Sequence, residues 1–249
     1  MNIPQDWQAP ANCLQNRIIL VTGAASGIGA SCARAFAAHG ATVVLLDLDL
    51  KALEKLYDEI EQTGGPLPAL YPLNLEGASE KDYNDLAGTL QREFGHLDGL
   101  LHNAALLGAL TPVAHYDTEL WYRVLQVNLN APFVLTRACL GLLMASDDAS
   151  ILFSSDRCGR QGRAYWGAYG VSKAGVECLM QTLADELEAN TTVRVNSLDP
   201  GPVATRLYSL AYPGRNPAGI AQPDEVVLPY LYLMSADSKG VSGKQFQIQ

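Results

Sequence analysis

Tyr169 and Lys173 are four residues apart in a run of helix-forming residues. This spacing places a phenol and an ammonium group one turn apart on the same face of a helix. A cation at that distance stabilises the phenolate and lowers a tyrosine pKa from its usual value of ~10. Such a tyrosine can exchange a proton with an alcohol or carbonyl oxygen near neutral pH. The pair therefore predicts acid–base chemistry, provided that a cofactor site and a polar group from a neighbouring strand lie beside it.

A glycine-rich turn follows the first strand that the sequence predicts, residues 17–22. Its glycines stand in Gly-x-x-x-Gly-x-Gly spacing and lead into an apolar-periodic helix at about 28–39. Glycines let the backbone turn sharply and approach a ligand closely, and a helix start offers free N–H groups and a positive dipole end to a pyrophosphate. We therefore predict a dinucleotide cofactor at this turn. The candidate residues are Gly23, Ser26, Gly27, Ile28 and Gly29.

Asp47 ends the second predicted strand, eighteen residues after Gly29, where an acid can bind the 2′-hydroxyl of a ribose. A carboxylate there repels a 2′-phosphate, and neither Ser26 nor Leu48 supplies a compensating positive charge. The sequence thus favours NAD(H) over NADP(H) as the cofactor. Asp47 can instead cap the following helix, and Asp49 can compete for either role.

The composition limits the classes of partner. Of 249 residues, 48% are hydrophobic, and 26 acids against 17 bases give a formal net charge of −9. This excess of acid argues against nucleic acid or an anionic membrane surface as the main partner, and we see no apolar run long enough to span a bilayer. Five scattered cysteines lack metal-ligand spacing, so we expect reduced thiols and no metal. Because no basic stretch precedes an apolar one in the first ten residues, we expect a cytoplasmic protein.

Strands and helices alternate along the whole chain. The predicted strands are residues 17–22, 41–47, 69–74, 97–102, 150–155, 192–198 and 245–248. The predicted helices are residues 28–39, 50–62, 79–94, 118–144, 165–190 and 223–235, and residues 206–222 are predicted to be a mobile loop with short helical pieces. Because each crossover between parallel strands needs a helix-length connection, the alternation predicts an α/β fold with a parallel sheet covered by helices on both faces. No linker or repeat divides the chain, so we expect one domain, residues 1–249.

Further short motifs lie at fixed places along the chain. In order they are residues 22–29, Asn103-Ala104-Ala105, Asn128, residues 169–173 and Pro200-Gly201. Together they resemble the short-chain dehydrogenase/reductase superfamily, and residues 17–23, 101–108 and 159–163 resemble its bacterial YciK-like branch. The resemblance implies a doubly wound Rossmann-type sheet of about seven parallel strands, usually in homodimers or homotetramers. It also implies hydride transfer between NAD(P)(H) and a small secondary alcohol or ketone.

The resemblance also implies a role for each matching residue. Tyr169 is the acid–base residue, Lys173 lowers its pKa and holds the nicotinamide ribose, and Asn128 positions a water that links Lys173 to solvent. Asn74 stands where an acid usually contacts the adenine, and its amide oxygen can still accept that hydrogen bond. The other residues implied to bind the cofactor are Leu75, Asn103, Ala104, Pro200, Gly201 and, at the carboxamide, Val203 and Thr205.

In this superfamily a serine thirteen residues before the tyrosine donates a hydrogen bond to the reacting oxygen, and here that position is Asp156. An ionised carboxylate accepts hydrogen bonds but donates none. It also opposes a tyrosinate, because two unit charges ~4 Å apart at an effective dielectric of ~20 interact by about 4 kcal/mol. That energy raises a tyrosine pKa by roughly three pH units, so Asp156 counteracts the effect of Lys173.

Four arrangements relieve this conflict. Asp156 can be protonated, can pair with a nearby arginine, can turn away while a serine takes over, or can bind a cationic or hydroxyl-rich substrate. The arginines and serines concerned are Arg157, Arg160, Arg163, Ser154 and Ser155. We interpret the chain as an oxidoreductase with Asn128, Asp156, Tyr169 and Lys173 as its catalytic residues. The alternative is an NAD(H)-binding sensor or interaction protein with little catalysis.

Overall fold

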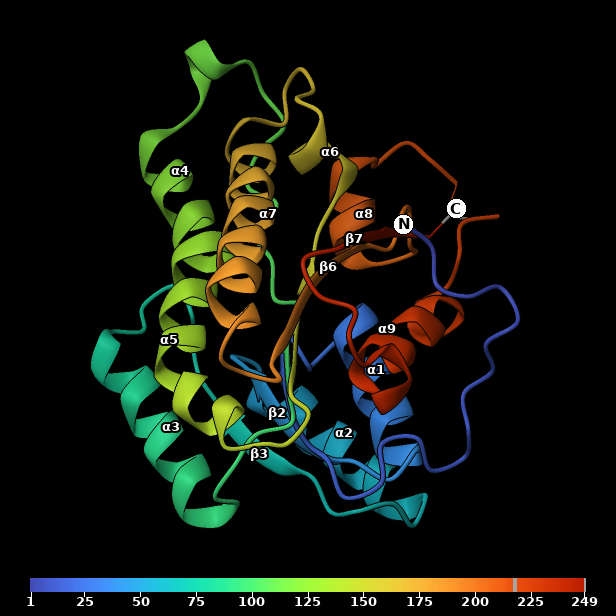
Figure 1. Cartoon of the computed structure of the whole chain (residues 1–249). Coiled ribbons are helices and arrows are strands. Elements are labelled where there is room, and N and C mark those ends of the chain that lie inside the picture. The colour runs from blue at the N-terminus through green and yellow to red at the C-terminus, as the bar shows by residue number, and fades with distance from the viewer. Residues whose placement is uncertain (217–218, 249) are drawn as a thin grey trace.

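Seven strands form one parallel sheet within residues 1–216 and 219–248, which the computed structural model describes (Figure 1). The strands are β1 Ile18–Thr22, β2 Thr42–Asp47, β3 Ala69–Pro72, β4 Gly99–His102, β5 Ser150–Ser154, β6 Arg194–Asp199 and β7 Gln245–Gln247. Their order across the sheet is β3-β2-β1-β4-β5-β6-β7, and every neighbouring pair is parallel. The order reverses between β1 and β4, which is where doubly wound folds open a crevice for ligands.

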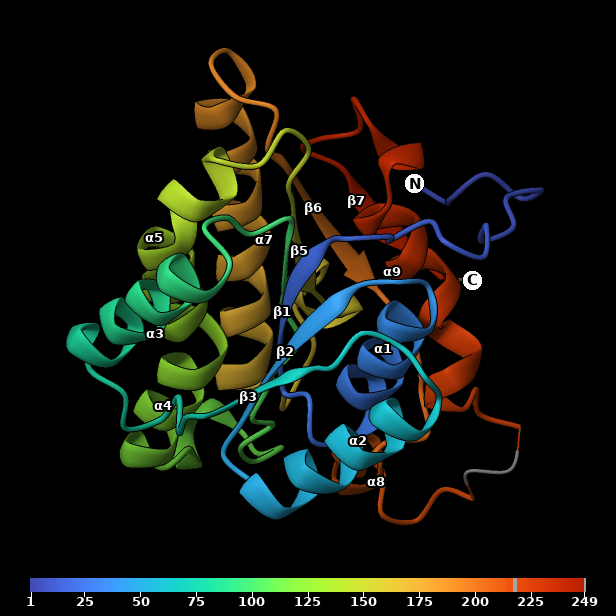
Figure 2. The same cartoon turned by 90° about the horizontal axis from the view of Figure 1, so that it is seen from below.

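Helices cover both faces of this sheet (Figure 2). They are α1 Gly27–Ala38, α2 Leu50–Gln62, α3 Glu80–Glu93, α4 Thr118–Leu125, α5 Ala131–Met144, α6 Arg157–Arg160, α7 Gly167–Glu188, α8 Arg206–Ala211 and α9 Val227–Met234. Helices α1, α2 and α9 pack on one face, and α3, α5 and α7 pack on the other, each group with its own apolar core. Strands β4 and β5 are buried at every residue because both of their faces are covered. The predicted fold class is therefore confirmed.

The helix predicted at 118–144 is continuous but not uniform. A π-helical segment, Gln126–Asn130, joins α4 to α5, and such segments are frequent at functional sites. By length and composition the whole stretch is apolar enough to cross a membrane, so our expectation that no such run exists was wrong. The residues of α5 that are buried, such as Leu135 and Leu143, pack against the sheet within one of the two apolar cores. In this fold the stretch has the position of a core helix.

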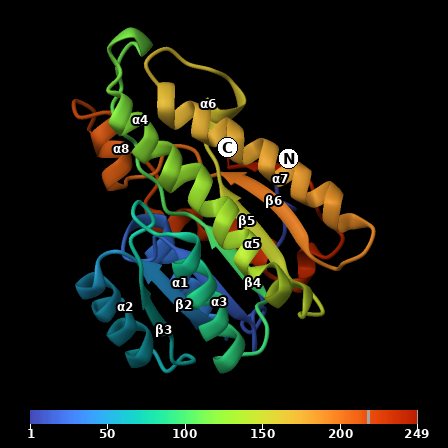
Figure 3. The same ribbon diagram turned by 90° about the vertical axis from the view of Figure 1, so that its left-hand side faces the viewer.

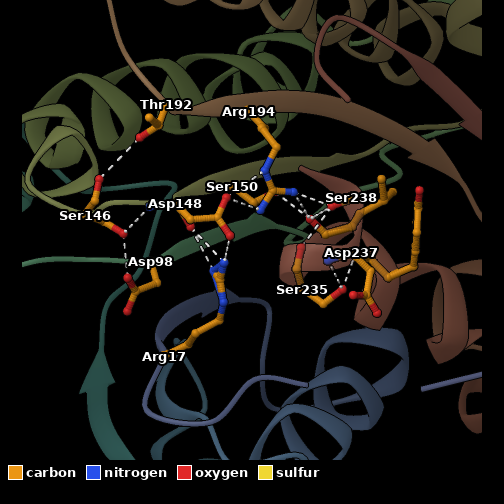
Figure 4. Close-up of polar contacts among 12 residues, drawn as sticks. Arg17, Asp98, Ser146, Asp148, Ser150, Thr192, Arg194, Ser235, Asp237 and Ser238 are labelled. Atoms are coloured by element: carbon orange, nitrogen blue, oxygen red, sulfur yellow. Dashed lines mark hydrogen bonds and ion pairs between the residues drawn. The ribbon is translucent and has the colours of Figure 1, made fainter. Parts of the chain in front are cut away.

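Buried charges fasten the edge of the sheet at which the strands begin (Figure 4). The Asp148 carboxylate pairs with Arg17, just before β1, and at 3.0 Å with Arg194, the first residue of β6. Arg194 also donates to the carbonyl oxygen of Leu233 in α9 at 3.2 Å and bonds to Ser238. This network holds the N-terminal ends of the strands together. The loops at the C-terminal ends of the strands form the site.

The bounds of several elements differ from the prediction. Helix α6 was missed because it has only four residues. The helix predicted at 165–190 begins at Gly167, since Tyr165 adopts a left-handed φ of 74° that a helix does not allow. The loop predicted at 206–222 contains α8, and its residues 217 and 218, like residue 249, lie outside the described part of the chain. That residues 1–249 form one domain stays a prediction.

Candidate active site

A large cavity opens at the carboxyl ends of the strands. Its volume is about 1470 Å³, and its walls are the segments that follow β1 to β6. Helix α6 follows β5 and α8 follows β6, so both lie at this end of the sheet (Figure 3). All the predicted site residues except Gly29 and Asn128 line the cavity.

The glycine positions of this turn leave no room for a side chain. Gly23 and Gly27 have φ values of 68° and 54°, which favour glycine. A Cβ atom on Gly29 would lie 2.0 Å from the carbonyl oxygen of Gly23, and a Cβ atom on Gly23 would lie 2.8 Å from the Cα atom of Ala104. A backbone packed this tightly brings the N–H groups at the start of α1 up to a phosphate. The residues present therefore fit the pyrophosphate of a dinucleotide.

Thr22 and Asn103 join the glycine turn to its neighbours. Thr22 Oγ1 accepts hydrogen bonds from the backbone N–H groups of Asn103 at 3.0 Å and Ala104 at 3.1 Å. Asn103 Nδ2 donates to the carbonyl oxygen of Gly23 at 3.4 Å, and its Oδ1 accepts from the Ser154 hydroxyl at 3.3 Å. Asn103 thus bridges the ends of β1 and β5, beside the place predicted for a ribose.

Asp47 and Asn74 bond to backbone groups at the end of the cavity where the adenosine is predicted to bind. The two carboxylate oxygens of Asp47 accept from the N–H groups of Ala25 and Asp49, each at 3.1 Å. Asn74 Oδ1 accepts from the N–H of Glu76 at 3.1 Å, so the oxygen predicted to contact the adenine already has one partner. Asp49, not Asp47, caps α2. The helix-capping alternative for Asp47 is therefore wrong.

Tyr169 and Lys173 lie one turn apart on α7, with only 5% and 4% of their surfaces exposed. The Lys173 ammonium is 5.6 Å from the centre of the Tyr169 ring and donates to the carbonyl oxygen of Ser154 at 2.6 Å. The ring of Trp166 packs against that of Tyr169, with centres 5.7 Å apart. The end of β5 thus fixes the lysine beside the phenol.

Burial dominates the ionisation of this pair. Desolvation, and after it the charge of Asp156, raises the pKa of Tyr169 well above its usual value. Desolvation also lowers the pKa of Lys173, while Asp156 opposes that effect. The sequence predicted that the pKa of Tyr169 is lowered. For the protein without its cofactor this direction is wrong, because spacing along a helix does not reveal how deeply a phenol is buried.

Asn128 lies behind the cavity, in the π-helical segment. Its Oδ1 accepts from the N–H of Leu106 at 2.7 Å, and its Nδ2 donates to the carbonyl oxygen of Leu106 at 2.9 Å and to Ser172 Oγ at 3.0 Å. The side chain therefore ties the segment after β4 to α7, directly beside Lys173. Both N–H groups of the Asn128 amide have partners within the protein, so the amide has none left to donate to a water.

Asp156 caps the short helix α6. One carboxylate oxygen accepts from the N–H of Cys158 at 2.8 Å, and the residue is partly exposed in the cavity wall. Within the described ranges no arginine forms an ion pair with it. Arg160 pairs with Glu177 instead, at 2.9 Å, and Arg163 donates to the hydroxyl of Tyr212. Neutralisation of Asp156 by an arginine, one of the expected arrangements, is therefore wrong.

Neither preceding serine replaces Asp156. Ser154 Oγ lies 3.3 Å from both Asn103 Oδ1 and the hydroxyl of Tyr230. Ser155 Oγ donates to the carboxylate of Glu177 at 2.5 Å. Both hydroxyl groups thus serve buried neighbours. A protonated Asp156 and a substrate-binding Asp156 are the two arrangements that remain.

Glu177 is a buried acid that the sequence interpretation missed. Besides the Ser155 hydroxyl, its carboxylate accepts from the Arg160 guanidinium. Because Arg160 is the last residue of α6, this pair anchors the helix that Asp156 caps against α7. A signal was present, since Glu177 stands four residues after Lys173 and shares its helix face.

Comparison with known proteins places this geometry in a family. Residues 17–214 match the sequence pattern described as short chain dehydrogenase. The chain belongs to the short chain dehydrogenase family. It is 40% identical over 243 residues to the uncharacterised oxidoreductase YciK of Escherichia coli K12, covering 98% of this chain and 96% of YciK. It is 32% identical over 243 residues to cyclohexanol dehydrogenase of Acinetobacter sp. strain SE19, covering 96% and 95%. This short chain dehydrogenase is therefore an oxidoreductase of CH–OH and C=O groups from the YciK-like branch, as predicted.

Solved structures of related dehydrogenases have the same fold. One from Pseudomonas syringae is 51% identical, with a TM-score of 0.96 over 98% of this chain and 99% of that one. One from Shigella flexneri 2a strain 301, complexed with NADP, is 39% identical with a TM-score of 0.93. One from Escherichia coli CFT073, complexed with NADPH, is 41% identical with a TM-score of 0.92. Each of these two comparisons covers 96% of this chain and 99% of the other.

The two complexes contradict the predicted preference for NAD(H) over NADP(H). That prediction rested on the charge of Asp47 and on the lack of a compensating positive charge at Ser26 and Leu48. In the structure both oxygens of Asp47 accept backbone hydrogen bonds, one from Ala25 in the glycine turn and one from Asp49, so the charge of the carboxylate is partly offset. The sequence shows the charge of a residue but not where its side chain points.

Proposed function

We propose that this dehydrogenase interconverts a secondary alcohol and a ketone with NADP(H), and that Tyr169 is its acid–base residue. The observation that carries the proposal is the buried pair of Tyr169 and Lys173 in the same cavity as the glycine turn. The names of two relatives support it, since cyclohexanol and cyclopentanol are secondary alcohols.

Different residues of the cavity would contact different parts of the cofactor. The glycine turn would hold the pyrophosphate, and Lys173 the nicotinamide ribose. Val203 and Thr205 would hold the carboxamide, and Thr205 faces the turn closely, since a Cβ atom on Gly27 would lie 3.2 Å from its methyl carbon. When bound, NADP(H) supplies or accepts the hydride. The remaining proposed contacts are Asp47, Asn74, Leu75, Asn103, Ala104, Pro200 and Gly201.

Tyr169 moves the proton that balances the hydride. In reduction its phenol donates a proton to the carbonyl oxygen, and the carbonyl carbon gains the hydride, so that a ketone becomes an alcohol. In oxidation the phenolate takes the hydroxyl proton. The raised pKa of Tyr169 keeps the phenol protonated near neutral pH, which favours the reductive direction. Lys173, linked to solvent through water at the backbone of Asn128, would return the proton.

Asp156 orients the substrate oxygen in this proposal. One of its oxygens accepts the cap bond of α6, and the Cys158 thiol also bonds to the carboxylate, which lines the cavity. A protonated carboxyl donates to a ketone oxygen, and a carboxylate accepts from an alcohol. The second interpretation from the sequence, a sensor with little catalysis, is motivated by the same residue, but the dehydrogenase names of the relatives favour the enzyme.

We further propose a cytoplasmic homodimer or homotetramer of one domain per chain that binds neither nucleic acid nor membrane. Exposed apolar side chains on α4, α5 and α7 support self-association, because Tyr122, Phe133 and Val171 are 60%, 49% and 50% exposed. Sedimentation of the purified protein tests this. A monomer at micromolar concentration would refute it.

Replacement of Tyr169 by Phe tests the proposed function. The variant keeps the ring and its packing but loses the exchangeable proton, so turnover of cyclohexanone with NADPH should fall at least ~10²-fold. Binding of NADPH, followed by the change in its fluorescence, should change less than about threefold. Undiminished turnover in the variant would refute the role of Tyr169.

A further inference from the structure

An apolar wall leads outward from Tyr169 along the cavity. The ring of Trp166 packs against those of Tyr169 and Tyr212, with centres 5.7 and 6.0 Å apart. Leu107 and Ala211 are buried in the same cluster. Such a wall binds an apolar body by removing it from water. It does not select for any polar group.

Two arginines stand at the outer end of this wall. Arg163 donates to the hydroxyl of Tyr212 at 2.9 Å, and its guanidinium lies 5.5 Å from the centre of the Trp166 ring. The guanidinium of Arg215 lies 4.9 Å from the centre of the Tyr212 ring. Stacking on aromatic rings orders a guanidinium that still has N–H groups to offer, which is a suitable arrangement for a carboxylate or a phosphate.

Neither Arg163 nor Arg215 has an acidic partner within the described ranges. Six other arginines form ion pairs with acids, namely Arg17, Arg34, Arg123, Arg137, Arg160 and Arg194. The five without such a partner are Arg92, Arg157, Arg163, Arg206 and Arg215, and all of these except Arg92 line this one cavity. In a chain with 26 acids and 17 bases, this concentration of unpaired cations indicates an anionic ligand.

The cofactor does not account for all of these arginines. Arg206 follows Thr205, which faces the glycine turn, so Arg206 belongs to the phosphate side of the cavity. Arg163 and Arg215 contact Trp166 and Tyr212 instead, on the side of the substrate. Both side chains are exposed and are therefore free to bind a second anion.

The charges of the cavity also favour one orientation of the bound substrate. Asp156 and Asp199 both act to raise the pKa of Tyr169, so the reacting end is acidic. An anionic group at that end would be repelled, whereas at the outer end it meets Arg163 and Arg215. The apolar wall lies between the two ends.

We propose that the substrate is an oxo acid or hydroxy acid. It has a ketone or secondary alcohol at one end, an apolar middle on Trp166 and Tyr212, and a carboxylate or phosphate bound by Arg163 and Arg215. This inference rests on the proposed function because it names the substrate class of the same site.

A length series of oxo acids tests the inference. The substrates are 4-oxopentanoate, 6-oxoheptanoate and 8-oxononanoate, each compared with its methyl ester, and the measurement is kcat/KM for oxidation of NADPH. At one length or more, the acid should exceed its ester by about tenfold or more, and higher salt should reduce the difference. Esters that equal or exceed their acids at every length overturn the inference.

Variants show whether the two arginines cause the preference. Arg163→Gln keeps a donor for Tyr212 but removes the charge, and it should lower the ratio of acid to ester about tenfold, as should Arg215→Gln. Arg163→Lys should keep part of the ratio. Arg92→Gln, which removes an unpaired arginine on α3 far along the chain from the site, should keep all of it. An unchanged ratio in both Gln variants at the cavity overturns the inference.

A binding measurement separates this inference from the proposed function. Calorimetry on the Tyr169→Phe protein loaded with NADP⁺ measures the affinity for each acid and ester without turnover. The Tyr169→Phe protein can bind acids more tightly than esters while the unmodified protein reduces neither the acids nor the esters. In that case the proposed function fails and the inference stands. If the protein reduces cyclohexanone but binds acids no better than esters, or binds neither, the inference fails and the proposed function stands.

Discussion

The carboxylate of Asp156 accepts a hydrogen bond from the backbone N–H of Cys158 at 2.8 Å. This contact gives the acid a structural role as the cap of α6, and the ion pair of Arg160 with Glu177 holds that helix against α7. The same carboxylate raises the pKa of Tyr169. One residue thus both shapes the wall of the cavity and adds to the effect of burial on the pKa of the proposed proton donor.

Replacing Asp156 by Ser should shift the pH dependence of alcohol oxidation. Serine also caps helices, so α6 should be retained. Oxidation needs the phenolate, and removal of the acid lowers the pKa of Tyr169, so oxidation should begin at a pH lower by about one unit. The measurement is kcat/KM for cyclohexanol with NADP⁺ from pH 6 to 10, with Asp85→Ser on the exposed side of α3 as control. An unshifted profile would mean that Asp156 carries no charge at the site.

The pH dependence of the two directions should differ in the unmodified protein. Because the pKa of Tyr169 is raised, the phenol stays protonated through neutral pH, and reduction should be nearly flat there and decline only in alkaline solution. Oxidation should rise with pH over the same alkaline range. Initial rates with cyclohexanone and cyclohexanol check both directions. A rate of oxidation that is already maximal at pH 6 would contradict the raised pKa.

Adding a methyl group to Gly29 should weaken cofactor binding by at least ~10-fold. A Cβ atom there would lie 2.0 Å from the carbonyl oxygen of Gly23, so the turn must open and its N–H groups lose their alignment. Fluorescence titration with NADPH measures the effect. Gly141→Ala is a matched control, because nothing lies within 4 Å of its added atom, and it should stabilise α5 by about 0.5–1 kcal/mol. Equal NADPH affinity in the two variants would contradict the prediction.

Asp47→Asn should tighten the binding of NADPH about threefold to tenfold. The amide oxygen can still accept from the N–H of Ala25, whereas the bond from the N–H of Asp49 is lost and a negative charge near the ribose is removed. Titration with NADPH at low salt checks this, and the effect should shrink as salt screens the charge. Weaker binding in the variant would mean that the carboxylate itself holds the cofactor.

Asp148→Asn should destabilise the fold without changing the site. The change removes the charge that pairs with the buried Arg194 and with Arg17, and breaking a buried pair typically costs about 3–5 kcal/mol. Urea denaturation measures the loss. KM for NADPH should not change, because Arg17 precedes β1 and Arg194 begins β6, whereas the cavity lies at the carboxyl ends of the strands. Glu59→Gln, which breaks an exposed pair with Arg34, is the control and should have little effect.

Local features of the chain were predictable because their physics is local. Alternating apolar runs and helix-length connections predicted the parallel sheet, and glycine spacing predicted the turn that a Cβ atom would fill. The four-residue spacing of Tyr169 and Lys173 predicted that they share a helix face, and they do. The turn and the pair depend on residues only a few positions apart, whose relative placement follows from the geometry of one turn or helix. The sheet followed from the helix-length connections between successive strands.

Tertiary structure decided the rest, because it depends on where side chains point and on which distant groups meet. The bonds of Asp47 to Ala25 and Asp49, the pairing of Arg160 with Glu177 and not with Asp156, and the burial that raises the pKa of Tyr169 all follow from packing. The unpaired arginines of the cavity come from segments that only the fold brings together. Charge and spacing can be counted along the chain, but desolvation and partner choice are properties of the space that the folded chain encloses.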